Sequence, residues 1–132
     1  GHGLFSTAPD YYRFCRMLLN RGKHEGRQLL SPKTVELMTT NHLPSELLPF
    51  ESGGEYFHGY GFGLGVRVLM APGRSGTLGS VGEFGWAGAA GTYFWIDPKE
   101  RMIGIEMSQS QPGGYYPVGA DFRVTAYQAL VE

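Results

Sequence analysis

The spacing of apolar residues changes near Tyr60, and this change limits the possible folds more than any other feature of the sequence. Before Tyr60 the apolar residues recur three and four positions apart, whereas after it they alternate with other residues. The first spacing is typical of a helix face and the second of a strand. Helical spacing returns over residues 119–131. This order predicts one domain over residues 1–132, with an α+β fold in which N-terminal and C-terminal helices cover an antiparallel sheet of about four strands.

Three helices are predicted. Thr7 has the position of an N-terminal cap, and Gly22 is expected to end the first helix. A second helix is expected to begin after Ser31 and to extend to about Thr40. The predicted buried stripe of the first helix comprises Tyr11, Phe14, Cys15 and Leu18, and that of the helix over 119–131 comprises Phe122, Ala126, Ala129 and Leu130.

The predicted strands all lie after residue 59. Apolar residues alternate with glycines over 60–68, and a short strand is expected over 79–84. Two longer strands are expected over 89–96 and 102–107, joined by the turn sequence Asp97-Pro98-Lys99-Glu100. Residues 43–58 mix prolines and glycines with apolar side chains and are interpreted as a loop that folds over a cleft.

The charge of the chain argues against several classes of partner. The formal net charge is -1, the pI is near 6.5, and the sequence has no run of like charges. Binding to nucleic acid or to an anionic membrane is therefore not expected. No apolar stretch approaches the roughly 18 residues of a membrane-spanning helix, and the sequence does not indicate a compartment. The single cysteine, Cys15, excludes an internal disulfide.

The sequence predicts no metal site and no cofactor. The four histidines are scattered, and none has a second histidine or a glutamate at ligand spacing. The glycines of Gly61-x-Gly63-x-Gly65 lie within the predicted alternating strand, not between a strand and a helix, so a dinucleotide is not expected. Neither Gly-x-Ser-x-Gly nor Ser-x-x-Lys is present, so these residues predict no serine nucleophile.

One segment has the composition of a substrate-binding strand. Trp86 is followed by three small residues, Ala87, Gly88 and Ala89. Side chains this small allow an acyl group to lie along the backbone, where free N–H and C=O groups of a strand can reach it. Two interpretations remain open for Trp86, a pocket wall or a core aromatic, and for Gly88, a binding position or a turn glycine. Glu83 and Tyr93 are expected either to rim the pocket or to be ordinary surface or sheet residues.

Taken together with three other segments, this motif resembles the C-terminal part of the penicillin-recognising serine hydrolases. The other segments are 3–10, 29–35 and 60–65, which occur in the order found in that family. The resemblance is to its class C β-lactamase and family VIII carboxylesterase-like branches, and in the esterase-like branch the Lys-Thr-Gly motif is often replaced by Trp-Gly-Gly or His-x-Gly. Here it reads Trp86-Ala87-Gly88. The resemblance covers nearly the whole chain and implies part of a β-lactamase/transpeptidase-like fold.

The resemblance implies acyl transfer through an acyl-enzyme. It implies that Ala89 donates its backbone N–H to an oxyanion hole, and that Trp86, Ala87 and Gly88 bind a small ester or amide substrate. The family's nucleophilic Ser, its Lys and its Tyr lie upstream of these segments, so this chain by itself is expected to be inactive. Because Trp86 lacks the charge of the usual Lys, ester hydrolysis or transacylation is favoured over β-lactam hydrolysis.

A second interpretation does not require catalysis. A sheet that ends in an unpaired strand presents backbone groups to a partner. The chain could therefore be a binding or assembly module that forms a homo-oligomer through an exposed sheet edge.

Overall fold

The computed structural model describes residues 4–111, 113 and 115–131, so Gly3 of the first family-like segment lies outside the described residues. Its helices are α1 (Ala8–Leu19), α2 (Pro32–Met38), α3 (Pro72–Ser75) and α4 (Val118–Gln128), with a 3-10 turn over Ser45–Leu47. The main sheet contains β5 (Tyr60–Phe62), β6 (Arg67–Leu69), β7 (Phe84–Ala87), β8 (Tyr93–Asp97) and β9 (Met102–Glu106). Two small hairpins are formed by β1 (Lys23–His24) with β2 (Arg27–Gln28), and by β3 (Phe50–Ser52) with β4 (Glu55–Phe57).

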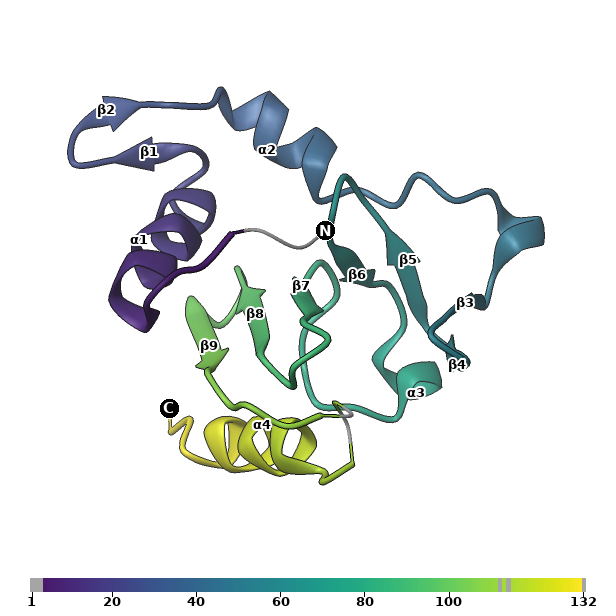
Figure 1. Cartoon of the computed structure of the whole chain (residues 1–132). Coiled ribbons are helices and arrows are strands. Elements are labelled where there is room, and N and C mark those ends of the chain that lie inside the picture. The colour runs from purple at the N-terminus through teal and green to yellow at the C-terminus, as the bar shows by residue number, and fades with distance from the viewer. Residues whose placement is uncertain (1–3, 112, 114, 132) are drawn as a thin grey trace.

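The main sheet is an antiparallel meander in the order β5-β6-β7-β8-β9. Figure 1 shows α4 along one side of this sheet, with α1 and the β1–β2 hairpin on another side. The predicted α+β class is therefore confirmed, with five strands in the main sheet where about four were expected.

Strand β8 shows how the two faces of the sheet are covered. Phe94 and Ile96 belong to the apolar cluster that contains Cys15 and Leu18 of α1. The alternate residue Trp95 points to the opposite face, where its indole lies 5.2 Å from the Phe122 ring of α4. Because both faces are covered, Phe94, Trp95, Ile96 and Asp97 are all buried.

The alternating segment 60–68 is not one strand. It folds back on itself, so that β5 and β6 pair with Phe62 opposite Arg67. Gly65 has φ +87°, a conformation that strongly favours glycine, and the Gly63 N–H donates to the Val66 C=O at 2.8 Å. The period of two did not show the turn between the two strands, and Leu64, which was predicted to lie on the apolar face, is 52% exposed in that turn.

The strands that flank the Trp86 segment are also displaced from their predicted positions. Residues 79–83 form a turn that is held by the Ser80 N–H, which donates to Asp97 Oδ2 at 3.0 Å. Strand β7 then begins at Phe84, and β8 begins only at Tyr93. Trp86 and Ala87 consequently lie at the end of a strand, where the sequence had predicted its start.

The predicted helix caps are confirmed. The hydroxyl of Thr7 accepts from the Asp10 N–H at 3.3 Å, and that of Ser31 accepts from the Thr34 N–H at 3.0 Å. The predicted apolar face of the last helix was wrong, because Phe122 is 37% exposed and Leu130 44% exposed, while the buried residue of α4 is Arg123. No helix within the described ranges is long and apolar enough to cross a membrane.

Candidate functional site

The backbone of the Trp86 segment is oriented by its pairing with β8. Trp86 lies opposite Phe94, Ala87 lies opposite Tyr93, and the Gly88 N–H donates to the Thr92 C=O at 2.7 Å. In an antiparallel ladder the backbone groups of alternate residues point to opposite sides. Those of Ala87 therefore point away from β8, towards the side where the pairing of β7 with β6 has already ended at Gly85. Ala89 follows the strand, in a turn in which the Gly91 N–H donates to the Gly88 C=O at 3.0 Å.

This part of the backbone is open to solvent. Ala87, Gly88 and Ala89 are all exposed. Within the described residues, the Ala89 N–H has no hydrogen-bond partner. A Cβ atom at Gly88 would overlap the side chain of Thr92, which explains a glycine at this position. The structure thus brings three of the four predicted site residues together as an exposed segment at one end of the central strand of the sheet.

The side chain of Trp86 has a different environment from the backbone that follows it. Its indole is half-buried and packs edge-on against Phe62, with the ring centroids 4.9 Å apart. A second contact, at 6.1 Å, is to Phe57 of β4. The indole also packs against the apolar cluster that faces α1. Trp86 is therefore a core aromatic whose backbone leads into the exposed segment.

The contribution of the β3–β4 hairpin was missed, since residues 43–58 were interpreted as a loop. Phe50 and Phe57 face each other across this hairpin and stack at 4.9 Å. A signal was present in the sequence, because Gly53-Gly54 between two short runs containing aromatics is a typical two-residue hairpin connection. The hairpin places its aromatic rings beside Trp86, so it forms part of the wall next to the exposed segment.

An arginine that the sequence did not single out lies among aromatic rings next to β7. The Arg67 guanidinium lies 4.8 Å from the ring centroid of Tyr60, 5.2 Å from that of Tyr93 and 5.4 Å from that of Phe57. It donates to the Tyr93 hydroxyl at 2.8 Å. Since Arg67 lies opposite Gly85, which has no side chain, it can reach across β7 to Tyr93 on β8.

Glu83 lies neither on the surface nor on a pocket rim. Its side chain is 2% exposed and forms an ion pair with Arg123 of α4, whose Nη1 donates to Oε1 at 2.7 Å. The Tyr127 hydroxyl lies 2.9 Å from Glu83 Oε2 and 2.8 Å from Asp97 Oδ2. Burial raises the pKa of Glu83, and the hydrogen bonds from Arg123 oppose that rise. These residues link the start of β7 to α4 and the end of β8.

Arg123 also meets the second sheet residue that was considered near the site. Its Nη1 donates to the Tyr93 hydroxyl at 3.0 Å, and its Nε donates to the Leu78 C=O at 2.7 Å. Tyr93 is therefore a half-buried sheet residue that receives hydrogen bonds from both Arg67 and Arg123. Because Glu83 and Arg123 are 40 residues apart, no local pattern in the sequence could have paired them.

Other features usual in functional sites lie elsewhere or are not found. Two depressions of the surface lie between α1 and the β1–β2 hairpin, and Trp86–Ala89 line neither of them. Within the described residues, no group of three or more His, Cys, Asp or Glu side chains is placed to hold a metal ion.

Comparison with known proteins shows the family to which the chain belongs. The family model described as Beta-lactamase matches residues 1–128. Protein Rv1367c of Mycobacterium tuberculosis is 41% identical over 116 residues, which are 85% of this chain and 29% of that protein. The solved structure titled "EstCE1, a hydrolase with promiscuous acyltransferase activity" aligns with a TM-score of 0.75 at 24% identity, over 92% of this chain and 30% of that one.

A further solved structure is that of simvastatin synthase (LovD) from Aspergillus terreus, in its LovD6 mutant. It aligns with a TM-score of 0.74 at 25% identity and covers 97% of this chain and 34% of that one. The chain belongs to the β-lactamase family and has part of the β-lactamase/transpeptidase-like fold. It spans less than a third of the length of the curated relative described above.

Proposed function

We propose that this chain forms the oxyanion-hole side of the acyl-transfer site of a serine hydrolase. In this proposal the nucleophilic Ser, its Lys partner and the Tyr come from residues outside these 132. The exposed backbone of Ala87, Gly88 and Ala89 binds the acyl group of the substrate in extended form. The Ala89 N–H donates to the oxyanion that develops when the serine attacks.

One observation carries the proposal. The Gly88 N–H is bound to the Thr92 C=O, and the next N–H in the segment, that of Ala89, lies in the turn between β7 and β8. It is exposed and has no partner within the described residues. A donor that is fixed in the turn between two paired strands and left unpaired is suited to stabilise a charge that appears only during reaction.

The proposed substrate is an uncharged ester or a similar acyl donor. Trp86 offers no cation for a substrate carboxylate, and its indole contacts Phe57 and Phe62. Next to the exposed backbone the wall is therefore aromatic and apolar. Such a wall favours acyl groups with apolar surface, because their transfer from water to an apolar contact is favourable.

The test replaces the Ala89 amide with an ester, which removes the N–H and leaves the side chain unchanged. In the full-length protein assembled by semisynthesis, kcat for a chromogenic ester should fall about 100- to 1,000-fold. The same replacement at Ala90 is the control and should change kcat less than about threefold. Equal losses at both positions would refute the role of Ala89.

The isolated 132-residue chain provides a second comparison. It should not turn over the ester and should not be labelled by a fluorophosphonate probe, because the proposed nucleophile is elsewhere. Stoichiometric labelling of the chain by that probe would place a nucleophile within it and overturn this part of the proposal.

We also propose that the chain can associate through strand β9. In the described part of the chain the sheet order ends at β9, so one edge of this strand has no strand partner. Ile103 and Ile105 are only half-buried, and Met107, just after the strand, is 44% exposed. An unpaired edge with apolar neighbours is suited to pair with the same strand of a second copy.

A further inference from the structure

A basic groove lies at the end of the sheet opposite to the Trp86 segment. Two adjoining depressions between α1 and the β1–β2 hairpin share four lining residues, namely Arg16, Asn20, Lys23 and Glu25. The volume of the first is about 310 Å³, and the second reaches Arg101. Arg101 lies in the turn between β8 and β9, whereas residues 88–92 turn between β7 and β8 at the other end of β8. We call the two depressions together the basic groove.

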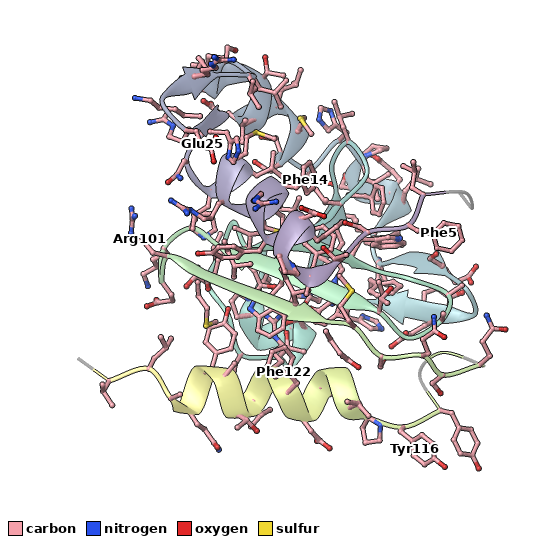
Figure 2. All side chains as sticks on the ribbon, turned by 60° about the vertical axis from the view of Figure 1, so that its left-hand side comes forward. Phe5, Phe14, Glu25, Arg101, Tyr116 and Phe122 are labelled. Atoms are coloured by element: carbon pink, nitrogen blue, oxygen red, sulfur yellow. The ribbon has the colours of Figure 1, made fainter. Side chains whose placement is uncertain are left out.

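The charge of the groove is very different from that of the chain. Its lining contains one carboxylate, that of Glu25, against five cationic side chains, those of Arg13, Arg16, Arg21, Lys23 and Arg101. The whole chain has a net charge of -1. Four of these cations lie within residues 13–23, and the fold adds Arg101 from the turn between β8 and β9. Figure 2 shows Glu25 and Arg101 on the same side of the molecule, with nitrogen-bearing side chains between them.

Most of these cations are available to a ligand. Within the described residues, Arg16, Arg21, Lys23 and Arg101 form no ion pair. Arg13 is paired with Asp10 at 2.6 Å. Like charges gathered in one concave site repel each other unless an anion occupies it, and the site then attracts anions from solution.

Three non-glycine residues around the groove have positive φ values, a conformation that is unfavourable for residues with a side chain. Arg21, Glu25 and Arg101 have φ values of 54°, 46° and 53°, and they are the non-glycine residues with positive φ among the described residues. All three line the second depression. Arg21 follows the end of α1, where its N–H donates to the Leu18 C=O and where glycine is the usual residue. The fold therefore places three charged side chains at turn positions around the same depression.

We infer that the basic groove binds a phosphate-bearing anion. Guanidinium and ammonium groups that converge on a small concave site match the several oxygens and the double charge of a phosphate group. The amide of Asn20 adds a polar group to the same lining. This inference does not depend on the proposed acyl-transfer role, because it rests on other residues at the other end of the sheet.

The first experiment titrates the 132-residue chain with inorganic pyrophosphate in a calorimeter at low ionic strength. Replacing two shared lining residues, in the variant Arg16→Gln/Lys23→Gln, should weaken binding at least tenfold. The matched control Arg74→Gln removes an exposed, unpaired cation outside the groove and should change binding less than twofold. Glu25→Gln removes the carboxylate of the groove and should tighten binding. Undetectable binding, or equal weakening in the control, would overturn the inference.

The second variant separates ligand binding from backbone strain. Arg21→Gly should raise the thermal midpoint, because glycine adopts positive φ without strain, and should weaken pyrophosphate binding at least threefold. A higher midpoint with unchanged affinity would show that the Arg21 side chain has no role in binding and would count against the inference. Circular dichroism establishes that each variant is folded before its affinity is measured.

Vesicles distinguish the source of the phosphate. The chain is sedimented with vesicles of phosphatidylcholine alone or with phosphatidylglycerol added. If pyrophosphate binds and the phosphatidylglycerol vesicles also carry down the chain, the natural ligand is a lipid headgroup. If pyrophosphate binds and the vesicles do not, it is a free phosphate compound. In both cases the Arg16→Gln/Lys23→Gln variant should lose the interaction and the Arg74→Gln variant should keep it.

Discussion

At the scale of single residues, burial changes the chemistry of the lone thiol. Cys15 of α1 is completely buried, and burial raises its pKa to about 12 from an ordinary value of 9.0. Since the thiolate is the reactive form, Cys15 should be alkylated by iodoacetamide at pH 8 far more slowly in the folded chain than in urea. Mass spectrometry of timed samples measures both rates. Equal rates would contradict the burial of Cys15.

The same shift predicts a dependence of stability on pH. The folded chain holds the Cys15 proton more tightly than the unfolded chain does, because the pKa is higher in the folded state. The corresponding stability is fully present below pH 9.0 and is lost as the pH rises towards about 12. Urea unfolding of Cys15→Ala should show a smaller loss over this range than unfolding of the unchanged chain, after correction for the cavity that the substitution leaves.

At the scale of elements, α4 is attached to the sheet through a buried ion pair. Arg123→Met would leave Glu83 buried without its cation, and losing one partner of a buried pair typically costs about 3–5 kcal/mol. Because burial already raises the pKa of Glu83, this carboxyl should become protonated in the variant. The loss of stability should therefore be smaller at pH 4.5 than at pH 7.5. A loss of packing alone would instead lower the stability equally at both pH values.

Urea unfolding at the two pH values measures this effect. The double variant Glu83→Gln/Arg123→Met should recover part of the stability, since no charge is then left buried. Arg74→Met, on the exposed face of α3, should change the free energy of unfolding by less than about 0.5 kcal/mol and is the control.

At the scale of the whole molecule, the open edge of the sheet determines how copies of the chain would meet. If β9 pairs with β9 of a second copy, sedimentation velocity should show a dimer that increases with concentration. Met107→Lys should weaken the dimer, because it places charges beside the shared edge at an exposed position. The control substitution Leu47→Lys, at an exposed position away from β9, should not weaken the dimer. A strictly monomeric chain at high concentration would contradict this proposal.

Local chemistry was enough to predict those features that depend on neighbouring residues. The caps at Thr7 and Ser31, the turn after Asp97 and the α+β class were all expected from the sequence and are present in the structure. The small residues after Trp86 were recognised for the same reason. Caps, turns and hydrophobic periods each involve residues within a few positions of one another, so the sequence contains all the information needed for them.

The remaining features depend on contacts between segments that are distant in sequence. The turn inside residues 60–68 depends on packing against α2, because the Leu64 N–H donates to the Met38 C=O at 2.9 Å. Glu83 is buried because Arg123, 40 positions away, neutralises it, and the basic groove includes Arg101 because the turn between β8 and β9 approaches α1. By itself the sequence determined the local elements and the family resemblance. Only the tertiary structure decided which faces are covered, which charges are paired and which backbone groups stay open, since these follow from long-range packing.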